Sequence, residues 1–163
     1  MDTDMSPRMN TAMGEEPSPL LAALLDEKAI IDLTIAYCWA LDTRKFEDLR
    51  AVFVAKATAD LAGVACEGVD AIIERCSRAL TPLDVSQHMV STHHVVVKGD
   101  NATCRCYFQA QHVRRAVEGP PNFILAGSYE DQLIRTPVGW RISRRTLTTM
   151  WTAGNPAIVG RTR

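Results

Sequence analysis

The sequence contains no apolar run long enough to cross a membrane. Its uninterrupted apolar runs are short, as at residues 20–25, whereas a helix needs about 20 apolar residues to span a bilayer. Residues 1–17 combine acids with prolines, whereas a signal peptide needs a basic start and an apolar core. We therefore expect a cytoplasmic protein with no membrane segment.

The chain also lacks an excess of charge of either sign. Its formal net charge is -1 and its basic residues are scattered, so it has no electrostatic footprint for nucleic acid. A short cluster of arginines near the C-terminus is typical of a solvated strand end and tail. We expect no nucleic-acid partner.

Cysteine is scarce, and the common cofactor motifs are missing. Five cysteines are an odd number and too few for a disulfide framework, which indicates reduced, buried thiols. Cys104 and Cys106 share one face of a strand about 7 Å apart, too far for adjacent ligands of one zinc ion. A glycine-rich phosphate loop, a dinucleotide fingerprint and a nucleophile elbow do not occur. We expect neither a metal nor a cofactor.

The first half of the ordered sequence has helical periodicity. Residues 1–17 have no periodic pattern and are expected to form a disordered tail. Ser18 and Pro19 are a suitable N-cap and first helical residue. Apolar residues at helical spacing then predict helices over 19–42, 45–53 and 68–80.

After Pro82 the apolar period changes from 3.6 to 2. Four strands are predicted, separated by turn sequences, and a short strand is expected over 58–64. The four strands cover residues 86–97, 102–113, 122–135 and 140–151. Helices followed by an antiparallel meander indicate an α+β fold in one domain over 18–155, with a C-terminal tail over 156–163. A sheet that covers three helices with one face has to curl, and its open end is the natural place for a ligand cavity.

Asp42 is the most informative acid because it stands at the C-terminal end of the first predicted helix. The macrodipole disfavours an acid there by up to about 1 kcal/mol, so a partner is expected elsewhere. His88 is the best candidate, since it stands at the start of a strand near the cavity mouth. His94 shares its parity and is expected to be a satisfied core or cross-strand residue, while His93 points the other way.

Four stretches together resemble a known family: "IIDLTIAYCWALDTRKFEDLRAVF", "SQHMVSTHHVVVKGDNATCRCYF", "AGSYEDQLIRTPVGWRISRR" and the closing Trp151. From about Leu24 to Trp151 the chain resembles the SnoaL-like branch of the nuclear transport factor two superfamily. The most similar group includes scytalone dehydratase, bile-acid dehydratase and hexachlorocyclohexane dehydrochlorinase. The resemblance implies a cone-shaped α+β barrel, with about three N-terminal helices packed into a strongly curved, mainly antiparallel sheet.

The resemblance also implies catalytic roles. The acid of "LDTR" and the histidine of "QHMVS" pair in the family, which makes Asp42 and His88 a His–Asp dyad with His88 as the base. A tyrosine stands five residues before the acid in the bile-acid dehydratases, so Tyr37 is either the acid or carbonyl-polarising donor or an ordinary core aromatic. Arg144 shares parity with the core positions of its strand and is expected to enter the cavity unless a bulge shifts the phase, leaving Arg145 in solvent.

Other side chains are expected to bind substrate. His112 continues the buried face of its strand, and Trp151, with Asn155, is placed at the cavity mouth. The full set of expected substrate-binding residues is Trp39, Phe53, Val90, Phe108, His112 and Trp151.

These patterns predict a cofactor-free lyase or isomerase, of dehydratase or polyketide cyclase type, acting on a mostly apolar cyclic small molecule. The alternative is a non-catalytic ligand-binding protein or an accessory subunit, such as the small subunit of a ring-hydroxylating dioxygenase, which needs no dyad. By resemblance, a homodimer or homotrimer is expected.

Overall fold

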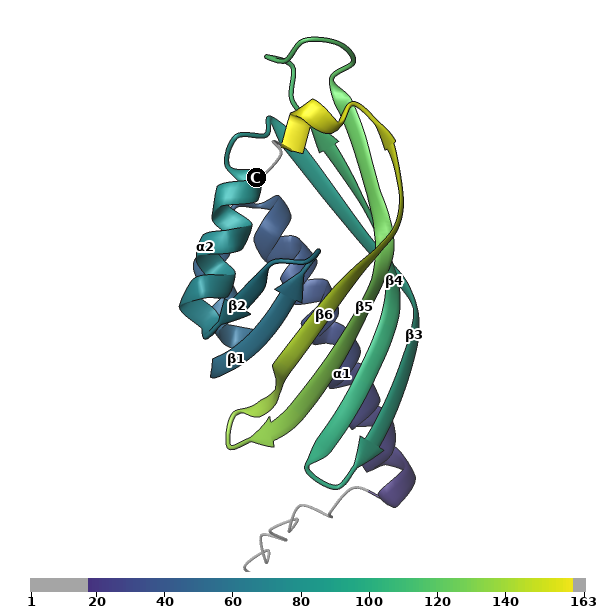
Figure 1. Cartoon of the computed structure of the whole chain (residues 1–163). Coiled ribbons are helices and arrows are strands. Elements are labelled where there is room, and N and C mark those ends of the chain that lie inside the picture. The colour runs from purple at the N-terminus through teal and green to yellow at the C-terminus, as the bar shows by residue number, and fades with distance from the viewer. Residues whose placement is uncertain (1–17, 160–163) are drawn as a thin grey trace, which may run out of the picture.

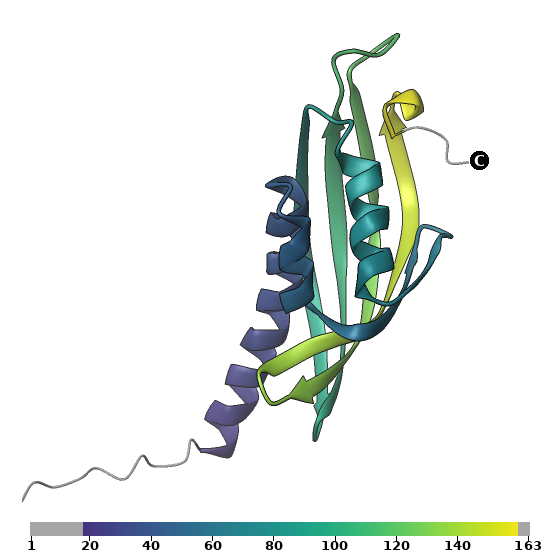
Figure 2. The ribbon, with the colours of Figure 1, turned by 90° about the vertical axis from the view of Figure 1, so that its left-hand side faces the viewer.

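The structure is a computed structural model, described here for residues 18–159. The expected tail over 1–17 and the end of the expected tail over 156–163 lie outside these residues. Six strands form one sheet in the order β2-β1-β6-β5-β4-β3. The sheet is strongly curved but not closed, and the helices lie against its concave side (Figures 1 and 2). The α+β prediction is confirmed.

Helix α1 (Pro19–Asp42) is a single long helix, as its capping signals predict. The Ser18 hydroxyl accepts a hydrogen bond from the Leu21 amide at 3.3 Å, and Pro19 fits the first turn because its missing N–H needs no partner there. The buried residues follow helical spacing and pack on the sheet: Ile30, Thr34, Tyr37, Cys38, Ala40 and Leu41. Trp39 lies off this stripe and is 67% exposed.

Four short elements follow α1. They are the 3₁₀ helix η1 (Phe46–Ala51), strands β1 (Phe53–Leu61) and β2 (Ala65–Glu67), and helix α2 (Val69–Leu80). The strand expected over 58–64 corresponds to β1, which begins and ends earlier than expected. β1 pairs with β2 in antiparallel orientation and with β6 in parallel, and α2 packs against both β1 and β2.

The predicted meander is present, with strands one to three residues longer than expected at their ends. It consists of β3 (Val85–Lys98), β4 (Asn101–Val113), β5 (Asn122–Thr136) and β6 (Gly139–Gly154). The four strands pair in sequence order and are antiparallel. Figure 1 shows them side by side, bending together over the helices.

A bulge in β3 reverses the expected orientation of two histidines. Ser91 pairs with Tyr107 and His94 pairs with Arg105, so two residues of β3 oppose one of β4. Thr92 lies in this interval at φ 57, a strained value for a β-branched residue. Beyond the bulge His93 faces α1, with its Nε2 2.8 Å from Thr34 Oγ1. His94 is exposed and pairs with Arg105 on the neighbouring strand, so of the two expected places for it the core is wrong.

Two bulges in β6 overturn two further predictions. Leu133 pairs with Ile142 and Gln132 with Arg144, which leaves Ser143 as an extra residue. This changes the parity, so Arg144 is exposed and Arg145 is fully buried. The expectation that Arg144 enters the cavity while Arg145 stays in solvent is therefore wrong.

The second bulge in β6 lies at Met150. Gly127 pairs with Thr149 and Ala126 with Trp151, so Met150 has no direct partner. The bulge turns Trp151 to the outer face of the sheet, where it is about half exposed. Its expected place at the cavity mouth is therefore wrong.

Arg145 and Asp131 form a buried ion pair in the core. Two hydrogen bonds of 2.8 and 2.7 Å join the guanidinium to the carboxylate, and both side chains are 0% exposed. The guanidinium also lies 4.2 Å from the ring centre of Tyr37 and 4.3 Å from that of Tyr129. A bidentate pair with two aromatic neighbours compensates part of the cost of burying the two charges.

The chain closes over the open end of the sheet. Asn155 donates to the carbonyls of Glu118 and Pro120 in the loop between β4 and β5. Residues 156–159, assigned to a tail from the sequence, form the 3₁₀ helix η2 (Pro156–Val159), in which Ile158 is buried. Among residues 18–159, the longest helix is too polar for a transmembrane span.

Candidate active site

A cavity of about 300 Å³ lies between the concave face of the sheet and the two helices. The end of α1, one face of α2, the turn after β1 and the upper halves of β3 to β6 form its wall, and Val159 of η2 contributes at the end of the chain. Most of the wall is apolar. The polar and aromatic side chains in it are Tyr37, Arg75, Cys76, His88, His112 and Tyr129.

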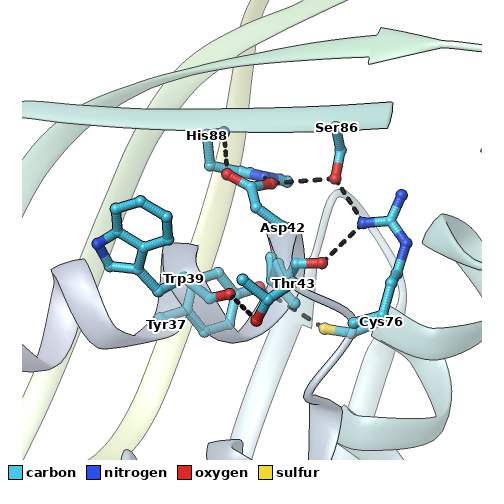
Figure 3. A network of polar contacts seen from close by, with 9 residues as sticks. Tyr37, Trp39, Asp42, Thr43, Cys76, Ser86 and His88 are labelled. Carbon is cyan, nitrogen blue, oxygen red and sulfur yellow. Dashed lines mark hydrogen bonds and ion pairs between the residues drawn. The ribbon is translucent and has the colours of Figure 1, made fainter. Parts of the chain in front are cut away.

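Asp42 and His88 lie in direct contact at this cavity. The Nδ1 atom of His88 is 2.6 Å from Oδ1 of Asp42, and the His88 backbone amide donates to Oδ2 at 2.7 Å. The last residue of α1 thus meets the beginning of β3 (Figure 3). The imidazole side chain is only 6% exposed and the carboxylate 16%.

Two further side chains support Asp42. Ser86 Oγ donates to Asp42 Oδ1 at 3.0 Å, and Arg44 Nη1 in turn donates to Ser86 Oγ at 2.7 Å. The same Arg44 nitrogen donates to the Leu41 carbonyl at 2.7 Å, one of the free carbonyls at the end of α1. Figure 3 shows these contacts as one connected network. An acid at a helix C-terminus is therefore stabilised by hydrogen-bond donors from a neighbouring strand.

The network keeps Asp42 ionised. Burial alone would raise the pKa of its carboxyl. This effect is outweighed by the hydrogen bonds from the His88 side chain and backbone, by the charge of His88 and by the Ser86 hydroxyl. The net pKa therefore lies below the ordinary value. A carboxylate can only accept a hydrogen bond, so Nδ1 of His88 must carry the proton that it donates. The neutral ring then has its lone pair on Nε2.

His112 is the second histidine in the cavity wall. It is 4% exposed, and its ring centre lies 5.8 Å from that of His88. Burial, with the positive charges of His88 and Arg44, lowers the pKa of His112 to about 4 against the opposing effect of Asp42. Its Nδ1 atom is buried and has no hydrogen-bond partner among residues 18–159. His112 is therefore a neutral polar group available to a ligand.

Tyr37 and Tyr129 line the cavity between the dyad and the buried ion pair. Their rings meet edge to face at 5.7 Å, and Phe108 stacks on Tyr129 at 4.5 Å. Burial raises the pKa of both phenols well above the ordinary value, so both keep their protons. The Tyr37 hydroxyl contacts Cys76 Sγ at 3.7 Å, a weak partner that another acceptor can replace.

Of the residues expected at the site, four line the cavity, Tyr37, His88, Phe108 and His112. Asp42 contacts His88 from behind the wall. The other expected residues lie elsewhere. Trp39 points into solvent because it lies off the buried stripe of α1, and Phe53 and Val90 pack in or against the core. Arg144 and Trp151 face outward beyond the bulges of β6.

Sequence reasoning missed several contributors to the site, among them Arg75, Tyr129 and Ser86. Arg75 stands next to the apolar stripe of α2, and that border position was its only signal. Tyr129 follows the inward parity of β5 together with Phe123 and Leu125. Ser86 shares the inward parity of His88 in β3, which indicates that it lies on the same side as Asp42.

The described residues do not gather metal ligands. Within 18–159, no group of three or more histidine, cysteine, aspartate or glutamate side chains is placed to hold an ion. The cysteines are buried free thiols, and burial raises the pKa of Cys38 and Cys104 to about 12. Thiols held in the protonated form are poor nucleophiles and poor metal ligands.

Comparison with known proteins identifies relatives over most of the chain. A model of a SnoaL-like domain matches residues 22–146. An uncharacterised protein of Mycobacterium tuberculosis is 32% identical over 134 residues, which cover 78% of this chain and 88% of that protein. Terrestric acid biosynthesis cluster protein E of Penicillium crustosum is 28% identical over 150 residues, 89% of this chain and 96% of that protein.

Solved structures agree with these matches. A Novosphingobium aromaticivorans protein named "Putative Scytalone Dehydratase" superimposes with a TM-score of 0.73 at 28% identity, and the match covers 80% of this chain and 88% of that one. The two chains therefore share a fold over most of their lengths.

Proposed function

The chain belongs to the SnoaL-like family, and from this membership and the Asp42–His88 pair we propose that it is a lyase or isomerase of dehydratase type. In the proposal, His88 removes a proton from a carbon atom of a mostly apolar cyclic small molecule, and protein side chains alone carry out the proton transfer. Relatives named for a dehydratase and for a biosynthetic cluster support a role in small-molecule metabolism.

Proton removal begins at Nε2 of His88. The C–H electron pair becomes the new carbon–carbon π bond as the bond to a leaving group on the neighbouring carbon breaks. Asp42 holds the ring in position and stabilises the imidazolium that forms, as a carboxylate does for the histidine of a serine protease triad. In a dehydration, the imidazolium proton then passes to the departing hydroxide, which leaves as water.

Tyr37 is the proposed donor to the substrate oxygen. If a carbonyl activates the C–H bond, negative charge develops on its oxygen as the proton leaves. A phenol that keeps its proton and has only a weak thiol contact can donate a hydrogen bond to that oxygen. The neutral His112 is a second candidate for the same contact.

One observation carries the proposal: a largely buried carboxylate and an almost fully buried imidazole, 2.6 Å apart, meet at the wall of a largely apolar cavity. A purely structural histidine would be expected to have both ring nitrogens satisfied by the protein. Among residues 18–159, Nε2 of His88 forms no hydrogen bond with a protein group, and a base in this position needs its lone pair free.

The test is turnover of a panel of cyclic β-hydroxy and β-halo carbonyl compounds, followed by mass spectrometry as loss of water or acid. The wild type should convert at least one member, and His88→Gln should not. Asp42→Asn should be at least a hundredfold slower, by analogy with triads that lose the orienting carboxylate. His94→Gln, an exposed histidine of the same strand, is the matched control. Turnover by His88→Gln within tenfold of the wild type would refute the proposal.

We also propose that the protein acts in the cytoplasm as a homodimer or homotrimer. Large side chains on the outer face of the sheet are half exposed around an open depression of about 740 Å³: Met89, Tyr107, Met150 and Trp151. An apolar group of this kind on a sheet face is typical of a protein contact. A second copy of the chain is the proposed partner.

A further inference from the structure

Among residues 18–159, Arg75 is the only arginine or lysine in the wall of the cavity. It lies on α2 next to Cys76 and one helical turn before Ala79, which line the same wall. Arg78, on the same helix, is exposed and pairs with Glu74 instead. The helix therefore directs one arginine to the cavity and the other to solvent.

Arg75 has no counter-charge in the described part of the chain. Its Nε atom is buried without a hydrogen-bond partner, and none of the ion pairs within residues 18–159 includes it. A guanidinium stays charged at any ordinary pH. Burying part of that charge without an anion is costly, and a bound anion would remove the cost.

The described part of the wall supplies no anion. Among residues 18–159, no aspartate or glutamate lines the cavity, and the carboxylate of Asp42 behind His88 already accepts three hydrogen bonds. Two imidazole nitrogens of the wall also have no partner among residues 18–159, Nε2 of His88 and Nδ1 of the neutral His112. The described wall is therefore mostly apolar with one unmatched positive charge.

We propose that Arg75 binds a carboxylate group of the substrate. This inference rests on the proposed function and narrows its substrate class to cyclic carboxylic acids. The planar guanidinium fork matches a carboxylate with two parallel hydrogen bonds. A phosphate would need several further donors, and the cavity offers one cation in a mostly apolar wall of about 300 Å³.

The position of Arg75 assigns it an anchoring role. Helix α2 packs on β1 and β2, whereas His88 lies on β3 at the opposite edge of the sheet order. A carboxylate held by Arg75 is thus bound by a different element of the cavity wall from the one that carries the base. In this proposal the carboxylate fixes the orientation of the ring in the cavity and takes no part in the proton transfer, so Arg75 is a binding residue.

Calorimetric titration with matched probes tests the assignment. The probes are cyclohexanecarboxylate, benzoate and 2-naphthoate, each compared with its neutral carboxamide. The wild type should bind at least one carboxylate at least tenfold more tightly than its amide. In Arg75→Gln this preference should fall below threefold, and in Arg75→Lys, which keeps the charge but loses the fork, it should be intermediate. Arg78→Gln, on the same helix, should retain the full preference.

Two results would overturn the assignment: no carboxylate preference in the wild type for any probe, or an unchanged preference in folded Arg75→Gln and Arg75→Lys. Circular dichroism establishes folding, and Arg75→Lys covers the case in which the glutamine variant does not fold. A titration of His88→Asn separates Arg75 from the imidazole, because the preference should persist there. Binding needs no turnover, so the two proposals can fail separately. A carboxylate preference in a protein that converts no member of the β-hydroxy and β-halo carbonyl panel would refute the proposed lyase but not the role of Arg75.

Discussion

His112 should make the stability of the protein depend on pH, and the size of the effect can be worked out. The pKa of the ring is about 4 in the fold, against 6.5 for an ordinary histidine. Between these values the unfolded chain binds a proton at residue 112 that the folded chain does not, so lowering the pH favours unfolding. The full pKa difference corresponds to about 3 kcal/mol in the free energy of unfolding. About 2 kcal/mol of this stability is lost between pH 7 and pH 5.

The assay is urea unfolding followed by tryptophan fluorescence, at a series of pH values, for the wild type and His112→Gln. Other groups titrate in both proteins, so the quantity of interest is the difference between them. The wild type should lose about 2 kcal/mol more than the variant between pH 7 and pH 5, while His94→Gln, which removes an exposed histidine, should behave as the wild type. Equal losses in wild type and His112→Gln, within about 0.5 kcal/mol, would refute the view that the fold holds this ring neutral.

Three other predictions follow from the packing and from the proposed roles. Asp131→Asn leaves the Arg145 charge buried without its partner and should reduce the free energy of unfolding by about 3–5 kcal/mol in urea titrations. Addition of Arg145→Met should restore much of the lost stability. A loss below about 1 kcal/mol in the single variant would contradict this account. Trp151→Glu should shift the protein toward monomer in light scattering, whereas an unchanged mass would exclude this face as the contact. The turnover rate should rise with pH through one ionisation because the base must be unprotonated, and a flat profile would argue against a histidine base.

The elements of the fold could be predicted from local patterns. Helical spacing located α1 and α2, and alternation located β3 to β6, with errors of a few residues at their ends. The parallel pairing of β1 with β6 could not be predicted, because it depends on packing between segments far apart in the sequence. The acid at a helix end and the histidine at a strand start made His88 a candidate partner of Asp42, and the family resemblance implied their contact, whereas their catalytic role stays a prediction.

The wrong side-chain orientations share one physical cause. Parity along a strand holds only until a bulge inserts an extra residue, and the bulges at Thr92, Ser143 and Met150 each reverse the residues beyond them. Gly127 is a feature of the sequence that could have indicated the bulge at Met150. A Cβ atom there would lie 1.9 Å from the Thr148 carbonyl oxygen, so the strands approach too closely for any side chain, and a glycine inside a strand indicates such a place.

Solvent deuterium exchange tests the central claim, proton abstraction by His88, most directly. A cyclic carbonyl compound that binds in the cavity is incubated with enzyme in deuterium oxide, and NMR follows loss of the hydrogen on the carbon next to the carbonyl. Exchange should be catalysed by the wild type, at least a hundredfold slower in Asp42→Asn and absent in His88→Gln. Exchange at the wild-type rate in His88→Gln, or none in the wild type with a bound ligand, would contradict the account.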